Sequence, residues 1–478
     1  MNKKILSNFL YQASYQLLLI IMPIVTIPVV SKALGPEGIG TYQYVFSIVN
    51  YFVLIAGLGL QNYGVREIAI VRENTKRLSK TFLELYFMNA TVSMVIIVSY
   101  FFIVSWLDNR YLFYIQGLVI LGSLFDISWF FGGLEEFKTI TIRNFIVKIA
   151  TLIAILVFIN DKTDLVLYFW IMGISTLVSQ LTLWITIKKY ILWTKISLKD
   201  VIKHIKPSLS FFLAKIAFQF YYNVSLTLLG LFATMSDVGY FSNGFNLIAI
   251  SGSIINALNT VMIPRMSNIF DKNQGRDMIK ILDKTIHIQL YVSIAISFGI
   301  MTINNKMIDW FYGPNFAPLN YIVPLLAVGL TFQILQTSIA SQYLIPRREM
   351  REYNKTVIIG AVVNFIIDII LIPYLGIYGA IIGYLISYGL LTYLRSRVLL
   401  KATEFSFHWN QIVKNCFSGF LMWGIVYLFT NNMQANILTT FVQCLFGAML
   451  YLLISTVLKS NPIANSEFIA KIINKLRR

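Results

Sequence analysis

The sequence has few charged residues, few cysteines and few histidines. Only 13% of its 478 residues are charged and 57% are hydrophobic, and the mean hydropathy is +0.70. A soluble domain has about 25% charged residues, so the composition excludes an ordinary soluble fold. The two cysteines, Cys416 and Cys444, fall on predicted helices of opposite direction, one near the inner face and one in the outer half. We therefore expect no disulfide.

Motifs for energy-driven or metal-dependent catalysis are missing from the sequence. It contains no GxxxxGK[ST] phosphate loop and no HExxH zinc motif. The three histidines, His204, His287 and His408, are all predicted in cytoplasmic stretches, and we interpret them as solvated or interfacial side chains. The sequence therefore predicts a carrier or conduit without a catalytic metal or cofactor, rather than an enzyme.

Long apolar segments dominate the chain. Each reaches or approaches the roughly 20 residues that cross the hydrocarbon of a bilayer. We expect an all-α protein with fourteen transmembrane helices at about residues 9–31, 40–61, 81–104, 111–133, 142–160, 165–188, 208–232, 238–263, 285–304, 317–345, 356–373, 377–400, 412–430 and 437–458.

Positive charge alternates between the gaps that separate these segments. If the amino terminus is cytoplasmic, 33 of the 39 basic residues fall in cytoplasmic stretches and 4 in external ones, while Lys148 and Lys215 lie inside segments. This asymmetry follows the positive-inside rule and predicts that both termini are cytoplasmic. With 13 acids inside and 6 outside, the faces sum to +20 and −2. The basic face suits anionic lipid headgroups, so no nucleic-acid partner is needed to explain the charge.

Two basic stretches have the pattern of helices that lie on the membrane surface. Residues 191–207 contain a predicted capping box from Ser197 to Asp200, and the tail at 459–478 repeats the amphipathic pattern. These stretches predict an N-lobe at 1–190, a linker at 191–207, a C-lobe at 208–400, a helix pair at 401–458 and a surface tail.

A motif recurs at an offset of 199 residues. Gly40 and Arg66 in the first copy correspond to Gly239 and Arg265 in the second, with 26 residues from glycine to arginine in both. Six predicted helices separate the copies, so the orientation of each copy is the same. Carriers with parallel repeats place the substrate path between two lobes.

Several segments resemble one family of exporters. They are residues 33–42 (ALGPEGIGTY), 57–67 (GLGLQNYGVRE), 125–132 (FDISWFFG), 238–241 (VGYF) and 263–265 (IPR). They are similar to the Wzx-type polysaccharide repeat-unit flippases of the multidrug/oligosaccharidyl-lipid/polysaccharide (MOP) exporter superfamily. The resemblance implies two pseudo-symmetric six-helix lobes around a central cavity, an additional helix pair, and a bacterial cytoplasmic membrane. It implies transport of an undecaprenyl-diphosphate-linked oligosaccharide from the cytoplasmic to the outer leaflet by alternating access, for capsule or O-antigen synthesis.

A diphosphate substrate would need cations inside the protein. The candidates are Arg66, Lys148, Lys215 and Arg265. Lys148 and Lys215 could instead snorkel to the inner headgroups, and the two arginines could simply follow the positive-inside rule. Asp126 and Asp368 are expected to form ion pairs or to exchange a coupling H⁺ or Na⁺. The leading interpretation of Asp126 is an ion pair with Lys148.

Neutral polar side chains could face the sugars of such a substrate. The candidates are Gln12, Gln16, Tyr44, Gln219, Asn223, Asn243 and Asn246. Hydrogen bonds between helices are the more common use of amides in a membrane. Pro23, Pro28 and Pro324 are expected to kink their helices.

Other functions remain open at this stage. A relative could flip the peptidoglycan lipid precursor or export drugs, and the chain could also be a noncatalytic subunit of an envelope-polysaccharide complex. We expect a monomer that contacts membrane lipids and works beside a polysaccharide polymerase and glycosyltransferases.

Overall fold

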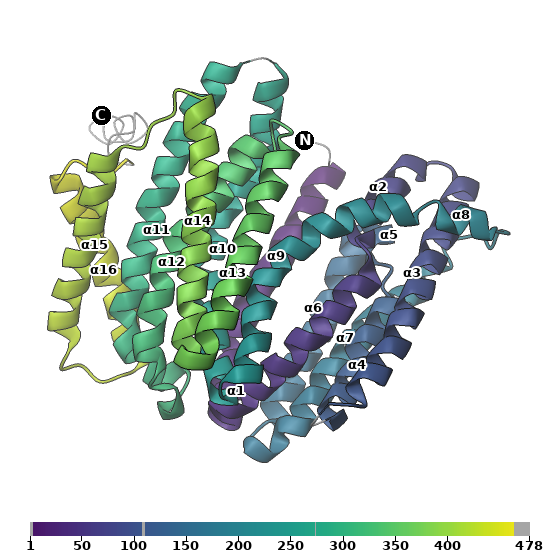
Figure 1. Ribbon diagram of the computed structural model, residues 1–478, viewed down its shortest axis with the longest axis horizontal. Helices are drawn as coiled ribbons and strands as arrows, with labels where there is room; N and C mark the ends of the chain where they lie inside the picture. The colour runs from purple at the N-terminus through teal and green to yellow at the C-terminus, as the bar shows by residue number, and fades with distance from the viewer. Residues whose placement is uncertain (1–2, 108–109, 273, 463–478) are drawn as a thin grey trace. The chain divides into compact units, whose positions relative to one another are not determined.

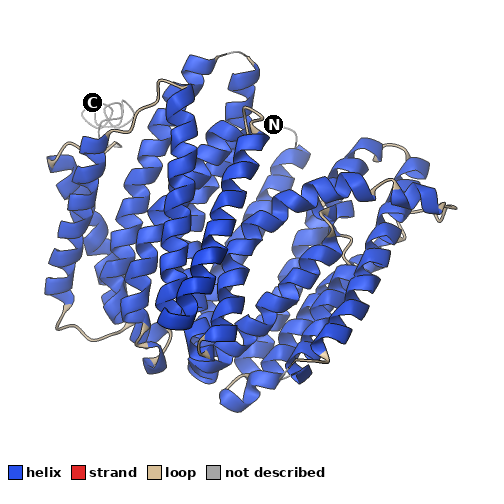
Figure 2. Cartoon of the chain, in the orientation of Figure 1, coloured by secondary structure: helices blue, strands red, loops and turns tan. Residues whose placement is uncertain are grey.

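The computed structural model describes residues 3–107, 110–272 and 274–462, although the side chains of most residues in 3–20 and 211–220 lie outside this description. Helices make up almost all of the described part of the chain, which contains no strand (Figure 2). Within hydrocarbon a helix satisfies its own backbone hydrogen bonds, which explains an all-helical solution for so apolar a sequence.

The helices are α1 (Lys3–Gly57), α2 (Leu60–Val71), α3 (Thr75–Val104), α4 (Arg110–Leu124), α5 (Ser128–Gly133), α6 (Phe137–Phe158), η1 (Lys162–Asp164), α7 (Leu165–Ile187), α8 (Leu198–Ile202), α9 (Ile205–Phe232), α10 (Met235–Asp271), α11 (Gly275–Phe311), η2 (Pro314–Phe316), α12 (Leu319–Ile339), η3 (Ala340–Leu344), α13 (Met350–Leu375), α14 (Ile377–Ala402), α15 (Trp409–Thr430) and α16 (Ile437–Val457).

The helices confirm the predicted all-α membrane architecture. Twelve segments of the described chain are long and apolar enough to cross a membrane. The first of them, Ile21–Val71, covers two predicted crossings, and α9 supplies the predicted seventh. Inside α1 the recorded break is at Gly35, with φ of 67° and ψ of −179°. This break lies just beyond Pro23 and Pro28, where the sequence had predicted kinks, at a φ that glycine adopts without strain.

The chain divides into two compact units, Met1–Gly239 and Tyr240–Arg478. In the first unit α3, α4, α6 and α7 lie side by side, and in the second α11, α12, α13 and α14 do so (Figure 1). Helix α9 clusters with the first unit, whereas the sequence assigned it to a C-lobe. The lobe limits proposed from the sequence remain a prediction, and the amphipathic tail beyond residue 462 lies outside the described residues.

A buried network of charged and polar side chains joins the segment between α7 and α9, here called the connector, to α2 and α3. The His204 ring has its Nε2 3.0 Å from Oε2 of Glu84 and its Nδ1 2.7 Å from the Tyr63 hydroxyl. The ammonium group of Lys203 lies 2.9 Å from the same Glu84 oxygen. The interpretation of His204 as a solvated side chain is therefore wrong, because only 5% of it is exposed. Its neighbours satisfy the polar groups that burial would otherwise leave unpaired.

The predicted capping box in the connector is confirmed. Helix α8 begins after Ser197, whose side chain accepts from the Asp200 amide while the Asp200 carboxylate accepts from the Ser197 amide. The Ser197 hydroxyl also donates to the Asp200 carboxylate at 3.0 Å. This bond first, then the contact with Lys80 and the bond from the Ser197 amide, lower the pKa of Asp200. The helix is only five residues long, so it is a fixed turn of the connector rather than an extended surface helix.

The duplicated glycines meet at a close helix crossing within the first unit. A Cβ atom on Gly40 would lie 1.6 Å from the carbonyl oxygen of Met235, and one on Gly239 would lie 2.0 Å from the carbonyl oxygen of Pro36. The offset of 199 relates Pro36 to Met235 and Gly40 to Gly239. Each copy thus contacts the other through the same pair of positions, which is the contact pattern of a two-fold relation.

Replacing Gly40 by alanine is expected to destabilise the protein. The added methyl group would press on backbone, which cannot rotate away, and overpacking of this kind costs about 1–3 kcal/mol. The measurement is the thermal midpoint of the purified protein in detergent, with Gly424→Ala as the control because a Cβ at Gly424 has no neighbour within 4 Å. Equal midpoints for the two variants would contradict the close crossing.

Candidate substrate-binding site

Two helix breaks in the first unit lie close to each other. Helix α1 gives way to α2 through Leu58 and Gly59, both with positive φ, at 38° and 72°. The segment predicted as one helix at 111–133 is divided, because α4 ends at Leu124 and α5 begins at Ser128. Helices α2 and α5 pack against each other. Both breaks free backbone carbonyls that a continuous helix would have satisfied.

Side chains from other helices satisfy these carbonyls. Non-helical backbone at membrane depth is tolerated only where protein or a wet cavity replaces the lost hydrogen bonds. The donors are an amide, two indoles and a hydroxyl. The bonds run from Asn89 Nδ2 to Ser123 O at 2.9 Å, from Trp184 Nε1 to Phe125 O at 2.9 Å, from Trp129 Nε1 to Asp126 O at 3.0 Å, and from Ser208 Oγ to Leu58 O at 2.6 Å.

A polar pocket of about 520 Å³ lies beside the breaks, and we call it the cation pocket. Residues from α2, α5, α6 and α7 line it. Among the described residues, the lining includes two cations and no acid. The lining residues are Gln61, Val65, Ser128, Gly132, Phe137, Ile140, Thr141, Arg143, Asn144, Lys148, Ser179 and Gln180.

A polar stripe on α6 directs Lys148 to the interior of the unit. Thr141, Asn144 and Thr151 are buried on the helix face that carries Lys148, at helical spacings of three and four. The Thr151 hydroxyl lies 2.6 Å from that of Ser175 on α7. Ile146, by contrast, is 64% exposed. The geometry therefore favours the pocket over snorkelling to the headgroups for Lys148.

Sequence reasoning overlooked Arg143 because the tally of charges assigned it to the cytoplasm. In the structure one of its terminal nitrogens donates to the Ser179 carbonyl at 2.6 Å and the other to Asn144 Oδ1 at 2.5 Å. These bonds fix the guanidinium at the wall of the cation pocket. The polar spacing of Thr141, Asn144 and Lys148 was the signal that could have revealed it.

A second pocket, of about 180 Å³, adjoins the cation pocket and shares Gln61 and Gln180 with it. We call it the amide pocket. It is lined by Asn50, Val53, Leu54, Gly57, Gly59, Leu60, Gln61, Asn89, Val119, Gly122, Ser123, Asp126, Trp129, Thr176 and Gln180.

The predicted ion pair between Asp126 and Lys148 is wrong for this conformation. Asp126 belongs to the amide pocket, and its Oδ1 accepts from the Ser128 amide at 2.8 Å, at the start of α5. Lys148 belongs to the cation pocket. Among the described residues no ion pair joins the two. A carboxylate at the first turn of a helix is favourable in itself, so Asp126 needs no lysine partner.

The other charged candidates lie elsewhere. Arg66 on α2 forms an ion pair with Glu67 at 2.7 Å and is 56% exposed. Arg265 is exposed on α10. Asp368 on α13 is fully buried and faces α14, where a Cβ on Gly383 would meet its Oδ1 at 2.0 Å. The side chain of Lys215 lies outside the described residues. Of the three predicted cations whose side chains are described, only Lys148 lines the cation pocket.

The predicted sugar-facing residues are placed in several environments. The side chains of Gln12, Gln16 and Gln219 lie outside the described residues. Asn223 and Asn243 are buried and Asn246 is half-buried. Tyr44 packs edge-on against Phe113. None of the described members lines the cation pocket or the amide pocket.

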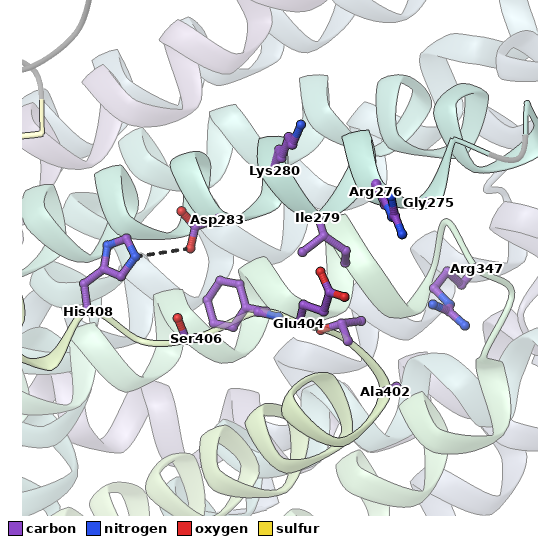
Figure 3. A pocket seen from close by; sticks show the side chains of 12 residues that line it. Gly275, Arg276, Ile279, Lys280, Asp283, Arg347, Ala402, Glu404, Ser406 and His408 are labelled. Carbon is purple, nitrogen blue, oxygen red and sulfur yellow. Dashed lines mark hydrogen bonds and ion pairs between the residues drawn. The ribbon is translucent and has the colours of Figure 1, made fainter.

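A third pocket, of about 660 Å³, lies in the second unit, lined by the ends of α11 and α14 and the segment before α15 (Figure 3). Asp283 and His408 line this pocket, and together with His287 they have ligand-type atoms within 4.8 Å of one another. In Figure 3 His408 points toward Asp283, and a distance of 3.8 Å separates its Nε2 from the Asp283 Oδ1.

Hydrogen bonding leaves His287 unsuited to hold a metal. Its Nδ1 lies 2.7 Å from the Asp283 carbonyl oxygen and so must carry the proton, while its Nε2 accepts from the His408 amide at 3.0 Å. Both ring nitrogens are thus used, and the ring stacks on that of His408 with centroids 4.0 Å apart. His287 is 7% exposed, so the interpretation of it as a solvated side chain is also wrong.

Zinc is therefore expected to leave the thermal midpoint of the protein unchanged. His287→Ala should lower that midpoint, because each lost hydrogen bond costs about 1 kcal/mol and the buried partners stay unpaired. His408→Ala is the matched comparison and should have the smaller effect, since its side chain is 42% exposed. A midpoint that rises with zinc, and does so only when His287 is present, would establish a metal site instead.

The fold is similar to that of two solved membrane transporters. A solved lipid II flippase MurJ, in an inward closed conformation, is 15% identical with a TM-score of 0.76, covering 94% of this chain and 98% of that one. A multidrug resistance MATE family transporter in an inward-facing conformation is 16% identical with a TM-score of 0.59, covering 80% and 96%. The two solved structures share this chain's fold.

The family follows from the sequence match. The model of the polysaccharide biosynthesis protein family matches residues 5–270, and the chain belongs to that family. A probable low-salt glycan biosynthesis flippase of Haloferax volcanii is 25% identical over 256 residues, or 52% of each chain, so the match spans about half of that relative. A candidate O-antigen transporter of Escherichia coli (strain K12) is 22% identical, covering 75% of this chain and 88% of the relative.

Proposed function

We propose that this protein flips a polyprenyl-diphosphate-linked oligosaccharide from the cytoplasmic to the outer leaflet of a bacterial cytoplasmic membrane by alternating access. The observation that carries the proposal is the cation pocket, where Arg143 and Lys148 lie among neutral polar groups and none of the described lining residues is an acid. The family membership and the relatives named for glycan flipping and O-antigen transport support it.

The chemistry of the pocket suits a diphosphate. Arginine presents forked donors that match phosphate oxygens, and lysine adds a compact charge on a long stem. In a medium of low dielectric these cations would offset much of the cost of bringing phosphate charge into the membrane. A drug exporter that selects organic cations would instead need acids, and none lines this pocket.

Transport requires no cofactor in this proposal. Coupling to H⁺ or Na⁺ through Asp126 or Asp368 stays a hypothesis, as does cooperation with a polymerase and glycosyltransferases. Asp126 is the more accessible of the two carboxylates, because it lines a pocket while Asp368 is fully buried.

Lys148→Met is expected to reduce flipping about tenfold or more, because a charge-assisted hydrogen bond to phosphate contributes about 1.5–3 kcal/mol. The measurement is the fraction of lipid-linked oligosaccharide on the inner leaflet of cells that depend on this protein, at equal protein level. Lys148→Arg should retain most activity. Lys188→Met is the matched control, since Lys188 is exposed at the end of α7.

Depletion of the protein tests the proposal as a whole. A lipid-linked oligosaccharide should accumulate on the inner leaflet, and its sugars can then be identified. Absence of accumulation would overturn the flippase proposal. Accumulation of the peptidoglycan lipid precursor would show that this precursor, and not a polysaccharide repeat unit, is the substrate.

A further inference from the structure

We infer that the amide pocket binds the sugar ring nearest the diphosphate, as a subsite next to the cation pocket. This inference rests on the proposed function. Its starting point is the shared wall, since Gln61 and Gln180 line both pockets. A group bound in one pocket lies beside a group bound in the other, just as the first sugar is joined directly to the diphosphate.

The lining of the amide pocket has the chemistry of a carbohydrate site. It presents the amides of Asn50, Asn89 and Gln180, the hydroxyls of Ser123 and Thr176, and one carboxylate. Amides donate and accept, and a carboxylate accepts from hydroxyl groups. None of the described residues that line this pocket is a cation, and the Asp126 carboxylate would repel a phosphate. The cation pocket therefore suits the charged diphosphate of the substrate, and the amide pocket suits its neutral sugar.

Two of these groups lack a partner in the described part of the protein. Oε1 of Gln180 and the hydroxyl of Ser123 are buried there without a hydrogen bond, and the half-buried Asn50 lines the same pocket. Buried polar groups in proteins are nearly always paired. Asn89 shows the contrast, because its amide donates to the Ser123 carbonyl at 2.9 Å. A ring with several hydroxyl groups supplies the partners that Ser123 and Gln180 lack, and the Asn50 amide is a further donor and acceptor in the same pocket.

Size limits the occupant to a small polar unit. The volume of about 180 Å³ is below the roughly 300 Å³ at which pockets for drug-sized ligands begin. An extended oligosaccharide cannot enter, so recognition in this pocket involves a single ring. A sodium ion on Asp126 is the competing occupant, and the binding experiment separates it from a sugar.

The test measures the affinity of the full-length protein in lipid nanodiscs for two probes. One is farnesyl diphosphate, and the other is farnesyl diphosphate linked to a single sugar, with glucose, galactose, N-acetylglucosamine and N-acetylgalactosamine each tried. The wild-type protein should bind at least one glycosylated probe about tenfold more tightly than farnesyl diphosphate, a difference of about 1.4 kcal/mol.

Asn50→Leu should remove most of this tenfold preference while leaving the Kd for farnesyl diphosphate unchanged, because Asn50 lines the amide pocket alone. Gln180 lines both pockets, so Gln180→Leu should reduce the preference and can change the Kd for farnesyl diphosphate as well. Lys148→Met should weaken both probes alike. Asn62→Leu is the matched control, because Asn62 is an exposed amide on α2 that lines neither pocket. Asn50→Ala and Gln180→Ala carry the test if a leucine variant does not fold.

The outcomes distinguish this inference from the proposed function. If the wild-type protein binds neither probe, carriage of a diphosphate lipid fails, and the subsite fails with it. If it binds both probes equally, or if Asn50→Leu weakens both equally, the sugar subsite is overturned while the cation pocket stands. Binding could instead depend on sodium. If Asn50→Leu and Gln180→Leu abolish that dependence and leave the sugar preference unchanged, the amide pocket binds the ion and not a sugar.

Discussion

In a membrane, a backbone carbonyl or amide that loses its helical partner has no water to replace it. Each unsatisfied group costs several kcal/mol in hydrocarbon. The first unit of this protein nevertheless breaks helices before α2 and before α5. The breaks persist because Asn89, Trp129, Trp184 and Ser208 donate to the freed carbonyls. Two of these donors, Asn89 and Trp129, also line the amide pocket, so the side chains that make the irregular backbone tolerable also form part of a polar pocket.

In the second unit, polar side chains likewise pair with one another beside an irregular helix. Helix α12 ends in the π-helical segment η3, which contains Gln342. Its amide donates to Asn259 Oδ1 and to Gln289 Oε1, each at 2.8 Å, so three amides from three helices satisfy one another. Nearby, Arg395 is 2% exposed and donates to the Gln336 carbonyl at 3.0 Å. Fully connected networks of this kind make buried polar groups tolerable.

The sequence was sufficient to predict the helices because length and apolarity decide them. The family motif at residues 125–132 was visible too, but its physical meaning was not, since the break before Ser128 depends on indoles supplied from positions such as Trp184. The histidines were misjudged for a related reason. A cytoplasmic position suggested solvent, whereas Glu84 and Tyr63 bury His204 through contacts far away in the chain.

Charge counting had a similar limit at the cation pocket. It identified Lys148 as exceptional because that residue is deep in a segment. It overlooked Arg143 and Arg395, which lie near predicted membrane boundaries and yet bond inside the protein. The direction of an arginine side chain depends on which helices pack beside it. Hydropathy along the sequence does not contain that information. The spacing of polar residues along α6 is the local sequence signal that comes closest to indicating which face of the helix is buried.

The crossing of Gly40 with Met235 and of Gly239 with Pro36 has a consequence for how the two copies of the motif can diverge. After a duplication, each copy usually drifts independently. Here a side chain gained at either glycine would meet backbone contributed by the other copy. Substitutions at these two positions, 199 residues apart in sequence, are therefore constrained by the same crossing, whatever changes occur in the surrounding helices.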